Sequence, residues 1–392
     1  MPAQRFERLG LVSGAVFSDL DGDGVPELIL ACEWGPVRVF KLHAGQYVET
    51  TRELGLAGFT GWWNGVATGD FDGDGRMDIV VSNWGLNSKY HPTPDRPVRI
   101  RYGDLAETGT IETVESYVDP ESGQEVPNRG WRQAQAAMPF LQDRVTSYQA
   151  YGQADLAGIY GERLKSASAV EATTLTSMVF LNRGDHFDTV PLPAEAQLAP
   201  AYGVCVADLD GTGTEDIFLS QNFFATNPDD WRHDAGRGLW LRGDGHGGFA
   251  PVPGQESGVR VYGEQRGCAV ADYDGDGRVD LVVTQNGNAT KLYHNRTAKP
   301  GLRVRLTGPP GNPTGIGAQL RLKFGDRLGA MREIQAGSGY WSVNSSVQVL
   351  ATPEPPRELW VRWPGGKVTT GAVAQGTREV TVDPSGKVEV KR

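Results

Sequence analysis

Cysteine, histidine and methionine are scarce in this sequence, and their scarcity argues against several kinds of protein. The 392 residues include only 3 cysteines, 6 histidines and 5 methionines. An odd number of cysteines without framework spacing argues against a disulfide scaffold, and the cysteines and histidines lack the spacing of zinc ligands. Cys32, Cys205 and Cys268 each lie in or beside a strand-like run. We therefore expect buried free thiols, which favours a reducing compartment.

Long apolar runs and an excess of positive charge are also missing. No stretch approaches the roughly 18 apolar residues of a transmembrane helix, so we expect no membrane span. With 38 Lys and Arg residues against 48 Asp and Glu residues, the formal net charge is −10. This charge argues against nucleic acid or an anionic membrane as the main partner. Residues 1–8 lack the apolar core of a signal peptide, so the chain as given predicts a cytoplasmic protein, or a secreted or periplasmic one if a leader was removed.

Glycine, in contrast, is abundant at 52 residues, as expected where tight turns join short strands. Many of these glycines belong to aspartate-rich loops of nine residues. Four clear copies, each followed by a short β-type run, begin at Asp19, Asp70, Asp208 and Asp272. A fifth stretch, 104–112, keeps the first aspartate, the glycine and the final acid, but has Ala106 and Thr108 at its third and fifth positions. Such self-similarity indicates a repeat architecture.

The loops have the composition of calcium sites. Calcium takes about six to eight oxygen ligands at roughly 2.3–2.6 Å, and oxygens at loop positions 1, 3, 5, 7 and 9 can surround one ion. Glycine at position 6 permits the sharp turn. The predicted carboxylate ligands are Asp19, Asp21, Asp23, Glu27, Asp70, Asp72, Asp74, Asp78, Asp208, Asp210, Asp216, Asp272, Asp274, Asp276 and Asp280. We expect weaker binding at the third loop, where Thr212 occupies position 5, and none at the stretch 104–112.

Two other kinds of loop have a similar composition. An EF-hand loop needs an acid at position 12 and flanking helices. Position 12 here lies inside the β run in every copy, as Leu30, Val81, Leu219 and Val283. The loops are therefore not EF-hands. The remaining alternative is that each loop is an Asp/Gly-rich turn without metal. Three intact copies in matching context argue against this alternative.

The repeat predicts an all-β fold, a calcium-binding β-propeller with five blades favoured. The units begin near residues 15, 66, 103, 204 and 268. The last unit lacks an outer strand, and we expect the N-terminal residues Gln4, Arg5, Phe6 and Glu7 to supply it and close the ring. Six or seven blades remain possible if the ring is built differently.

Two regions depart from the repeat. Residues 131–165 have apolar positions at helical spacing, so we expect a helical insertion at about 119–177 in the third blade, lying over one face of the propeller or simply facing solvent. After Pro300 the chain alternates as strands. We therefore predict a propeller domain at 1–299 and a smaller β-sandwich-like domain at 300–392.

A ligand site is predicted on the face opposite the loops, where strands end in amides and aromatic residues. The candidates, with nearby segments, are Glu33, Trp34, Trp62, Trp63, Asn83, Trp84, Gln221, Asn222, Trp231, Arg232, His233, Gln285 and Asn286. The alternative is that the amides cap strand ends and the tryptophans fill gaps between blades. Only His233 beside Asp234 suggests an acid–base pair.

The motifs carry a family resemblance that covers nearly the whole chain. The aspartate-rich loops resemble the FG-GAP/VCBS repeats of integrin α-subunit propellers. The tail resembles the ASPIC/UnbV domain of cartilage acidic protein and many bacterial proteins, in the stretches 315–318, 336–340 and 361–366. Where that family usually has an FGLG-like turn, this chain reads Val349-Leu350-Ala351-Thr352-Pro353. The resemblance implies architecture and calcium, and no particular chemistry.

Two functions follow. The preferred one is a calcium-stabilised binding module that recognises a protein, a glycan or a small molecule at the propeller mouth. The alternative is an enzyme acting on a natural product or sugar, with the insertion as a lid. A deep pocket under residues 131–165 containing His233, Arg232 or Glu33 would favour the enzyme, and a flat open mouth would favour binding.

Overall fold

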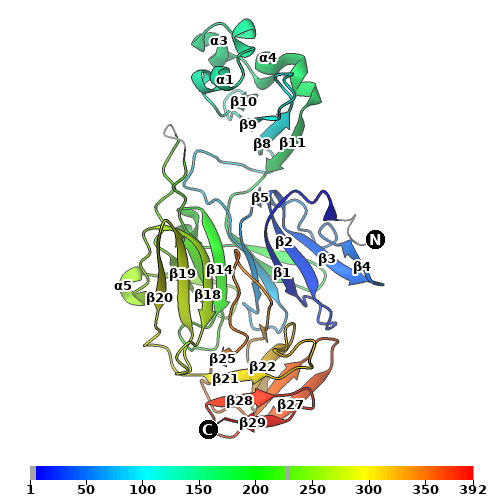
Figure 1. The fold of residues 1–392 in the computed structure, drawn as a ribbon, viewed down its shortest axis with the longest axis vertical. Coiled ribbons are helices and arrows are strands. Elements are labelled where there is room, and N and C mark those ends of the chain that lie inside the picture. Colours follow the sequence, from blue (N-terminus) through cyan, green and yellow to red (C-terminus); the bar gives the residue numbers. More distant parts are fainter. Residues whose placement is uncertain (1–5, 227–229, 392) are drawn as a thin grey trace.

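The computed structural model describes residues 6–226 and 230–391, whose regular structure is mostly β. Three bodies are stacked along the long axis: an inserted domain, a body of four sheets, and a C-terminal domain (Figure 1). Among the described residues, no helix combines the length and the apolar character needed to cross a membrane. Cys32, Cys205 and Cys268 are buried and free, which confirms the prediction for the thiols.

The central body consists of four antiparallel sheets, each following the chain from its first strand outward. The first contains β1 (Leu11–Ser18), β2 (Glu27–Pro36), β3 (Arg38–His43) and β4 (Gln46–Glu49), with β5 (Thr60–Trp62) on the end of β2. The second contains β6 (Val66–Gly69), β7 (Asp78–Val81), β12 (Met178–Asn182) and β13 (Phe187–Pro191). The third contains β14 (Ala201–Ala207), β15 (Asp216–Gln221), β16 (Leu239–Gly243) and β17 (Phe249–Val252), and the fourth β18 (Glu264–Ala271), β19 (Asp280–Asn286) and β20 (Asn288–Tyr293). Short helical turns lie at η3 (Ala194–Gln197) and α5 (Gly254–Ser257).

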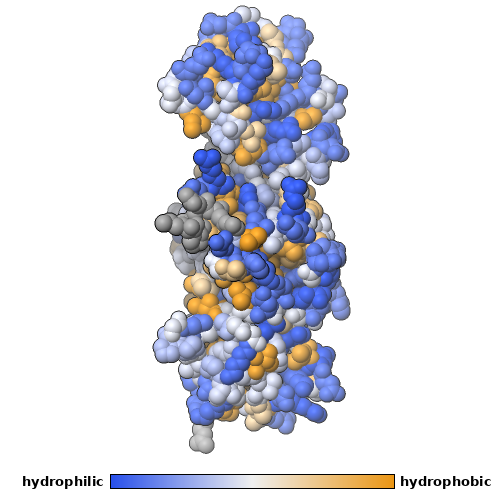
Figure 2. Space-filling model, turned by 90° about the vertical axis from the view of Figure 1, so that its right-hand side faces the viewer, coloured by the Kyte–Doolittle hydropathy of each residue, from blue (hydrophilic) through white to orange (hydrophobic). Residues whose placement is uncertain are grey.

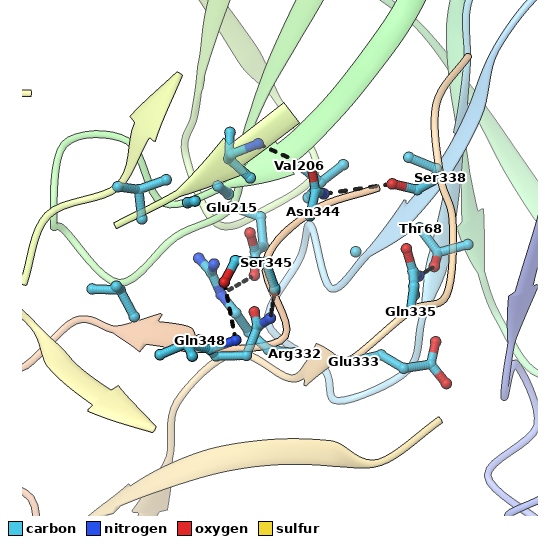
Figure 3. Close-up of a pocket in the computed structure, with 18 of the residues that line it drawn as sticks. Thr68, Val206, Glu215, Arg332, Glu333, Gln335, Ser338, Asn344, Ser345 and Gln348 are labelled. Carbon is cyan, nitrogen blue, oxygen red and sulfur yellow. Dashed lines mark hydrogen bonds and ion pairs between the residues drawn. The ribbon is translucent and has the colours of Figure 1, made fainter. Parts of the chain in front are cut away.

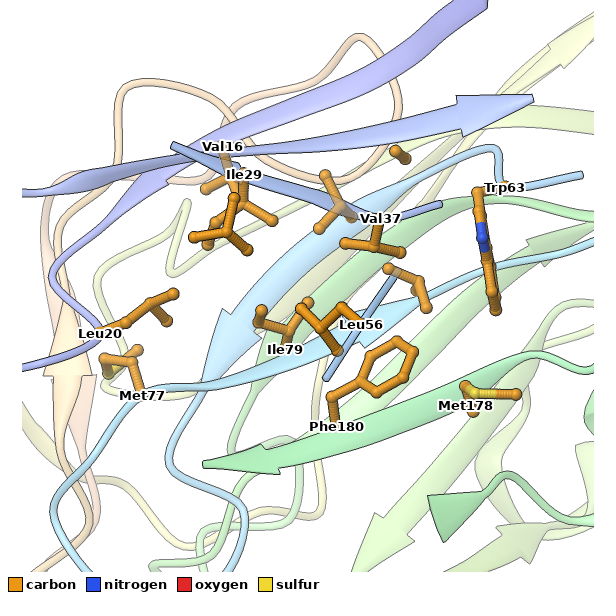
Figure 4. Close-up of a cluster of buried hydrophobic side chains, with 14 of the residues drawn as sticks. Val16, Leu20, Ile29, Val37, Leu56, Trp63, Met77, Ile79, Met178 and Phe180 are labelled. Atoms are coloured by element: carbon orange, nitrogen blue, oxygen red, sulfur yellow. The ribbon is translucent and has the colours of Figure 1, made fainter. Parts of the chain in front are cut away.

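Neighbouring sheets pack face to face through apolar side chains. The first strands contact in the order β1, β6, β14 and β18, and a separate core lies between each pair of neighbouring sheets. Figure 4 shows the first of these cores, where Val16 and Ile29 of the first sheet face Ile79 and Phe180 of the second. Burying each such side chain contributes about 1.5–3 kcal/mol, so these cores hold the sheets in their arrangement.

The inserted domain interrupts the second sheet between β7 and β12. Its sheet has the order β10-β9-β8-β11. Its elements are β8 (Val98–Gly103), β9 (Glu112–Val118), β10 (Glu125–Pro127), α1 (Trp131–Ala137), α2 (Leu141–Arg144), α3 (Tyr148–Gln153), α4 (Leu156–Tyr160), η2 (Gly161–Ser166) and β11 (Ser168–Ala172). The helices and Leu105 share one core, at the end far from the four sheets (Figure 1).

Three details differ from the sequence prediction. The unit expected near residue 103 belongs to the inserted domain, which has its own sheet as well as helices, and the insertion lies in the second sheet instead of a third blade. Phe6 contacts Phe40 and Tyr47 of the first sheet at ring distances of 5.4 and 5.7 Å, so it does not extend the fourth sheet. Gln4 and Arg5 lie outside the described residues. Within the described residues, the fourth sheet has three strands.

The C-terminal domain packs two sheets around one core. Its strands are β21 (Leu302–Leu306), β22 (Gln319–Phe324), β23 (Arg327–Leu328), β24 (Arg332–Glu333), β25 (Gln348–Leu350), β26 (Glu358–Arg362), β27 (Val368–Ala372), β28 (Glu379–Val382) and β29 (Val388–Val390). Alternating residues such as Leu320 and Leu322 point into this core, which leaves the residues between them free to face outward.

Residues 337–345, between β24 and β25, leave the C-terminal domain and run among the four sheets. Gly339 exchanges backbone hydrogen bonds with Val66 of β6, at 2.6 and 3.2 Å, and Ser345 donates to the Val270 carbonyl of β18 at 3.0 Å. We call residues 337–345 the central segment. It occupies the space between the first and fourth sheets.

The core between the first and second sheets generates a stability prediction. Phe180→Ala should lower the free energy of unfolding by about 3–5 kcal/mol, because it leaves a cavity at a fully buried site. Leu292→Ala in β20, a side chain that is 57% exposed, should change it by less than about 0.5 kcal/mol. Urea unfolding followed by circular dichroism measures both, and equal effects would contradict the assigned core.

Candidate metal sites and ligand surface

Each of the four sheets carries one aspartate-rich loop, between its first and second strands. In every loop, carboxylate oxygens from positions 1, 3 and 9 lie within 4.8 Å of one another. The groups are Asp19, Asp21 and Glu27; Asp70, Asp72 and Asp78; Asp208, Asp210 and Asp216; and Asp272, Asp274 and Asp280. Three converging carboxylates are the donor set that a hard divalent cation prefers.

Backbone hydrogen bonds hold each loop in a wrapped shape. In the first loop, the Asp19 carboxylate accepts from the Gly22 and Gly24 N–H groups at 2.8 and 3.0 Å. Both glycines have positive φ, at 78° and 83°, where an L side chain would be strained. Glu27 at position 9 accepts from the Leu20 N–H at 2.8 Å. The first and last acids are therefore fixed by the loop itself.

Burial makes these carboxylates unfavourable without a cation. Glu27 Oε1 and Asp70 Oδ1 are buried, and neither atom has a hydrogen-bond partner among the described residues. Burial raises the pKa of Glu27 and Asp216 to about 7 and that of Asp78 to about 8. Buried charge is stable only when it is paired or bound to a metal. The donor set, the burial and the unpartnered oxygens all fit a calcium ion.

A basic side chain from the same sheet faces each loop. Lys41 contacts Asp21, Asp23 at 3.0 Å and Glu27 at 4.0 Å. The other loops are faced in the same way by Arg183, Arg242 and His294, which lie within 3.9 Å of loop carboxylates. The lysine and the two arginines offset part of the negative charge of their loops.

The degraded loop at 104–112 keeps the wrapped shape without the cluster of acids. Asp104 accepts from the Gly109 N–H at 3.0 Å, and Glu112 accepts from the Leu105 N–H at 2.8 Å. Hydrogen bonds from the Ala106 N–H and from the Thr110 hydroxyl lower the pKa of Glu112. The carboxylates of this loop accept hydrogen bonds from the backbone and from the Thr110 hydroxyl of the same loop.

The predicted ligand residues divide into separate groups, of which one is aromatic. Trp62 stacks on Trp84 with 4.0 Å between ring centroids, and Trp34 lies 5.2 Å from Trp62. The buried His233 ring lies 5.1 Å from Trp84. All three tryptophans pack against the base of the inserted domain, including Val98 and Ala172. This cluster supports the inserted domain and is largely covered by it.

The predicted amides bond mainly within the four-sheet body. Asn83 donates to the carbonyls of 174 and 176, and Asn222 to those of 236 and 263. Gln221 and Gln285 donate to backbone carbonyls and Asn286 to Glu264, while Glu33 is half-buried and its pKa is raised by burial. The amides thus act as caps for strand ends and loops.

The last candidates lie apart from the aromatic cluster. Trp63 is fully buried in the first core, and Trp231 is 57% exposed. Arg232 pairs with Asp234 at the surface. The structure therefore does not gather the predicted residues into one open mouth.

A surface that sequence reasoning missed lies on the central segment. Trp341 is 87% exposed and has φ of 50°, an unusual value for a tryptophan. It stacks on Tyr340 at 5.1 Å, Tyr340 packs on Tyr202 at 5.4 Å, and the Arg266 guanidinium lies 4.0 Å from the Tyr202 ring. Only the position of 340–341 between the sheets reveals this arrangement, because local sequence carries no signal for it.

Two grooves flank Trp341. A groove of about 570 Å³ separates it from β1 and is lined by Ser13 and Ser342. A second, of about 440 Å³, separates it from β18 and is lined by Thr284 and Asn286. A further cavity of about 50 Å³ lies between the sheets and the C-terminal domain (Figure 3) and has room only for a few water molecules. The grooves beside Trp341 are large enough for a small ligand.

Comparisons with known proteins place two segments in families. Residues 19–81 match the FG-GAP-like repeat, and residues 308–389 match the ASPIC and UnbV family. The chain is 32% identical over 127 residues to cartilage acidic protein 1 of Xenopus tropicalis, covering 31% of this chain and only 20% of that protein. The chain therefore carries an FG-GAP-like repeat and an ASPIC/UnbV domain, as its motifs predicted.

Solved structures give a weaker likeness. Rhamnogalacturonan lyase YesW is 14% identical with a TM-score of 0.31, covering 92% of this chain and 56% of that one. Exotype rhamnogalacturonan lyase YesX is 13% identical with a TM-score of 0.30, covering 92% and 55%. Scores this low carry no argument about fold or function.

The raised pKa values generate a pH prediction for the metal-free protein. Unfolded carboxyls titrate near pH 4, whereas Glu27, Asp216 and Asp78 titrate at about 7, 7 and 8 in the folded state. Between these values the native state binds more protons, so the free energy of unfolding should fall as pH rises from about 5 to 8.

Chemical denaturation of chelator-treated protein at several pH values measures this slope. Asp78→Asn should make it shallower, whereas Asp104→Asn in the degraded loop should leave it unchanged. Stability that rises with pH over this window would contradict the assigned burial.

Proposed function

We propose that this chain is a calcium-stabilised binding module whose ligand contacts the aromatic surface at Trp341. The four sheets are blades of a β-propeller, and the central segment of the C-terminal domain occupies the gap between the first and fourth blades. The domains are then 1–299, interrupted by an insertion between β7 and β12, and 300–392. Calcium has a structural role, because it balances carboxylates that the fold buries.

The main reason to place the ligand here is that Trp341 is exposed while its ring stacks on that of Tyr340. An 87% exposed indole gains nothing from the core, and its positive φ adds backbone strain. Its support from Tyr340 and Tyr202 keeps one flat face presented. An exposed aromatic face bordered by hydroxyls and amides suits a glycan, which offers both apolar C–H faces and hydroxyl groups.

Charge narrows the choice of glycan. The formal net charge of −10 disfavours a strongly anionic polymer. The Arg266 guanidinium beside the aromatic stack is already paired with Glu264 at 2.6 Å, so it offers little free positive charge. A neutral oligosaccharide is therefore the favoured ligand, and a protein or another small molecule is the alternative outcome of a binding screen.

The enzyme alternative depended on a lid formed by residues 131–165. Helices α1–α4 instead pack around Leu105 and one another, away from the four sheets (Figure 1). His233 lies at the tryptophan cluster beneath the base of the inserted domain, and burial lowers its pKa. No observation favours catalysis over binding.

Calcium should stabilise the protein strongly. Excess calcium should raise the melting temperature above that in chelator by several degrees, because the ion binds only the folded loops. Asp78→Asn should reduce the calcium-dependent part of the shift, and Asp104→Asn should not. Thermal unfolding and metal analysis of the purified protein measure this. A protein without bound metal that shows no shift would refute the calcium role.

Trp341→Ala should weaken ligand binding without unfolding the protein. Titration of a panel of neutral oligosaccharides, followed by calorimetry, should give at least one ligand whose Kd rises about tenfold or more, equivalent to about 1.4 kcal/mol. Trp231→Ala removes another exposed tryptophan and serves as the matched control. Equal loss in both variants, or no oligosaccharide binding to the native chain, would contradict the glycan proposal.

A further inference from the structure

The C-terminal domain contacts every one of the four acidic loops through an arginine. Arg362 of β26 donates to the Gly22 carbonyl at 2.7 Å and lies 3.8 Å from Asp19. Arg303 of β21 pairs with Asp272 at 2.7 Å. Each of these contacts joins a strand of one domain to a predicted cation site of another.

The second and third loops follow the same rule. Arg332 of β24 pairs with Glu215 of the third loop at 2.8 Å, as Figure 3 shows. Arg321 of β22 lies close to Gly75 of the second loop, and the Met331 N–H of the same domain donates to the Asp70 carboxylate at 2.7 Å. Each loop is thus approached by one arginine of the C-terminal domain.

The strand pattern of the C-terminal domain produces this match. Arg321 lies between Leu320 and Leu322, whose side chains fill the domain core, and Arg303 lies between two other core residues in β21. Alternation along a strand therefore points these arginines away from the core, toward the loops.

Charge balance links the arginines to the ions. In the first loop, four carboxylates (Asp19, Asp21, Asp23 and Glu27) are faced by two basic side chains, Lys41 and Arg362. The Glu333 carboxylate of the C-terminal domain also accepts from the Asp19 N–H at 3.0 Å, so negative charge remains in excess at this loop. In the third loop, four carboxylates (Asp208, Asp210, Glu215 and Asp216) are likewise faced by Arg242 and Arg332. Either the ion or the arginine alone would leave buried charge unbalanced.

The contacts also depend on loop shape. The Gly24 carbonyl accepts from the Gly365 N–H at 2.8 Å, and the Gly277 carbonyl accepts from the Gly301 N–H at 2.8 Å. These carbonyls belong to glycines at position 6 of their loops, where the wrapped turn sets their direction. A change in the shape of a loop would therefore move these carbonyls away from the C-terminal domain.

We propose that the divalent ions and the C-terminal domain bind the loop face cooperatively, with Arg303, Arg321, Arg332 and Arg362 as positioning residues. This rests on the proposed calcium sites. Ion binding adds to the backbone hydrogen bonds that shape the loops, the loops hold the C-terminal domain, and that domain holds the central segment between the first and fourth sheets. Calcium then controls the presentation of Trp341 from the opposite side of the body.

Reciprocal coupling gives the first test, because a contact that strengthens docking must also strengthen ion binding. The double variant Arg332→Ala with Arg362→Ala, in the full chain, should bind calcium about tenfold more weakly at two of its sites, within the usual coupling range of roughly 5–150-fold. The matched control is Arg305→Ala with Arg378→Ala, which removes two exposed arginines of the same domain. Calorimetry with calcium chloride measures both.

Hydrogen exchange of the native chain gives a second test that needs no variant. Chelation should increase deuterium uptake in residues 337–345, while β9–β11 of the inserted domain should change little. If calcium binds the native chain but uptake in 337–345 is unchanged, or both double variants weaken binding equally, the coupling is refuted. If calcium does not bind the native chain at all, the proposed calcium role fails first, and the two failures are thereby distinguished.

Discussion

The buried carboxylates of the four acidic loops are the constraint on which the rest of the structure depends. A carboxylate such as Asp78 is almost fully enclosed, and its neighbours in the loop are acids as well. Such a cluster is tolerable only with compensating positive charge. The protein meets this need from two directions, with a basic side chain from the same sheet and an arginine from the C-terminal domain. The loop face thereby becomes the interface between two domains (Figure 1).

The loops were the most predictable part because their information is local. Nine consecutive residues set the positions of the acids and of glycines such as Gly24, so the carboxylates that converge are the ones predicted at positions 1, 3 and 9. The strands of the C-terminal domain were equally predictable, since the alternation of apolar and polar residues in stretches such as 319–324 is visible in the local sequence. The number of sheets in the central body could not be predicted in this way, because it depends on which strands pair across long separations. β7 pairs with β12 about a hundred residues later, and the sequence contains no signal for that register.

The predicted ligand residues do not form one site, for a related reason. Trp34, Trp62 and Trp84 do meet, as their places at strand ends suggested, but their faces are used by the base of the inserted domain. Composition identifies an aromatic cluster and does not identify its partner. Trp341 directly follows the motif stretch 336–340, and only the path of the central segment gives it prominence. On the face shown in Figure 2, apolar residues lie in small groups among polar ones, so hydropathy alone does not single out a site there.

The path of residues 337–345 also bears on how the molecule is assembled. The space between the first and fourth sheets is filled by a segment made after both sheets, and β25 then returns to pair with β21. During synthesis the four sheets must therefore wait, with an unfilled gap, until this late segment emerges. A boundary near residue 300 marks a change of architecture without being a place where the polypeptide divides into independent halves. Expression of residues 1–299 alone would leave the inner edges of β1 and β18 without the segment that separates them.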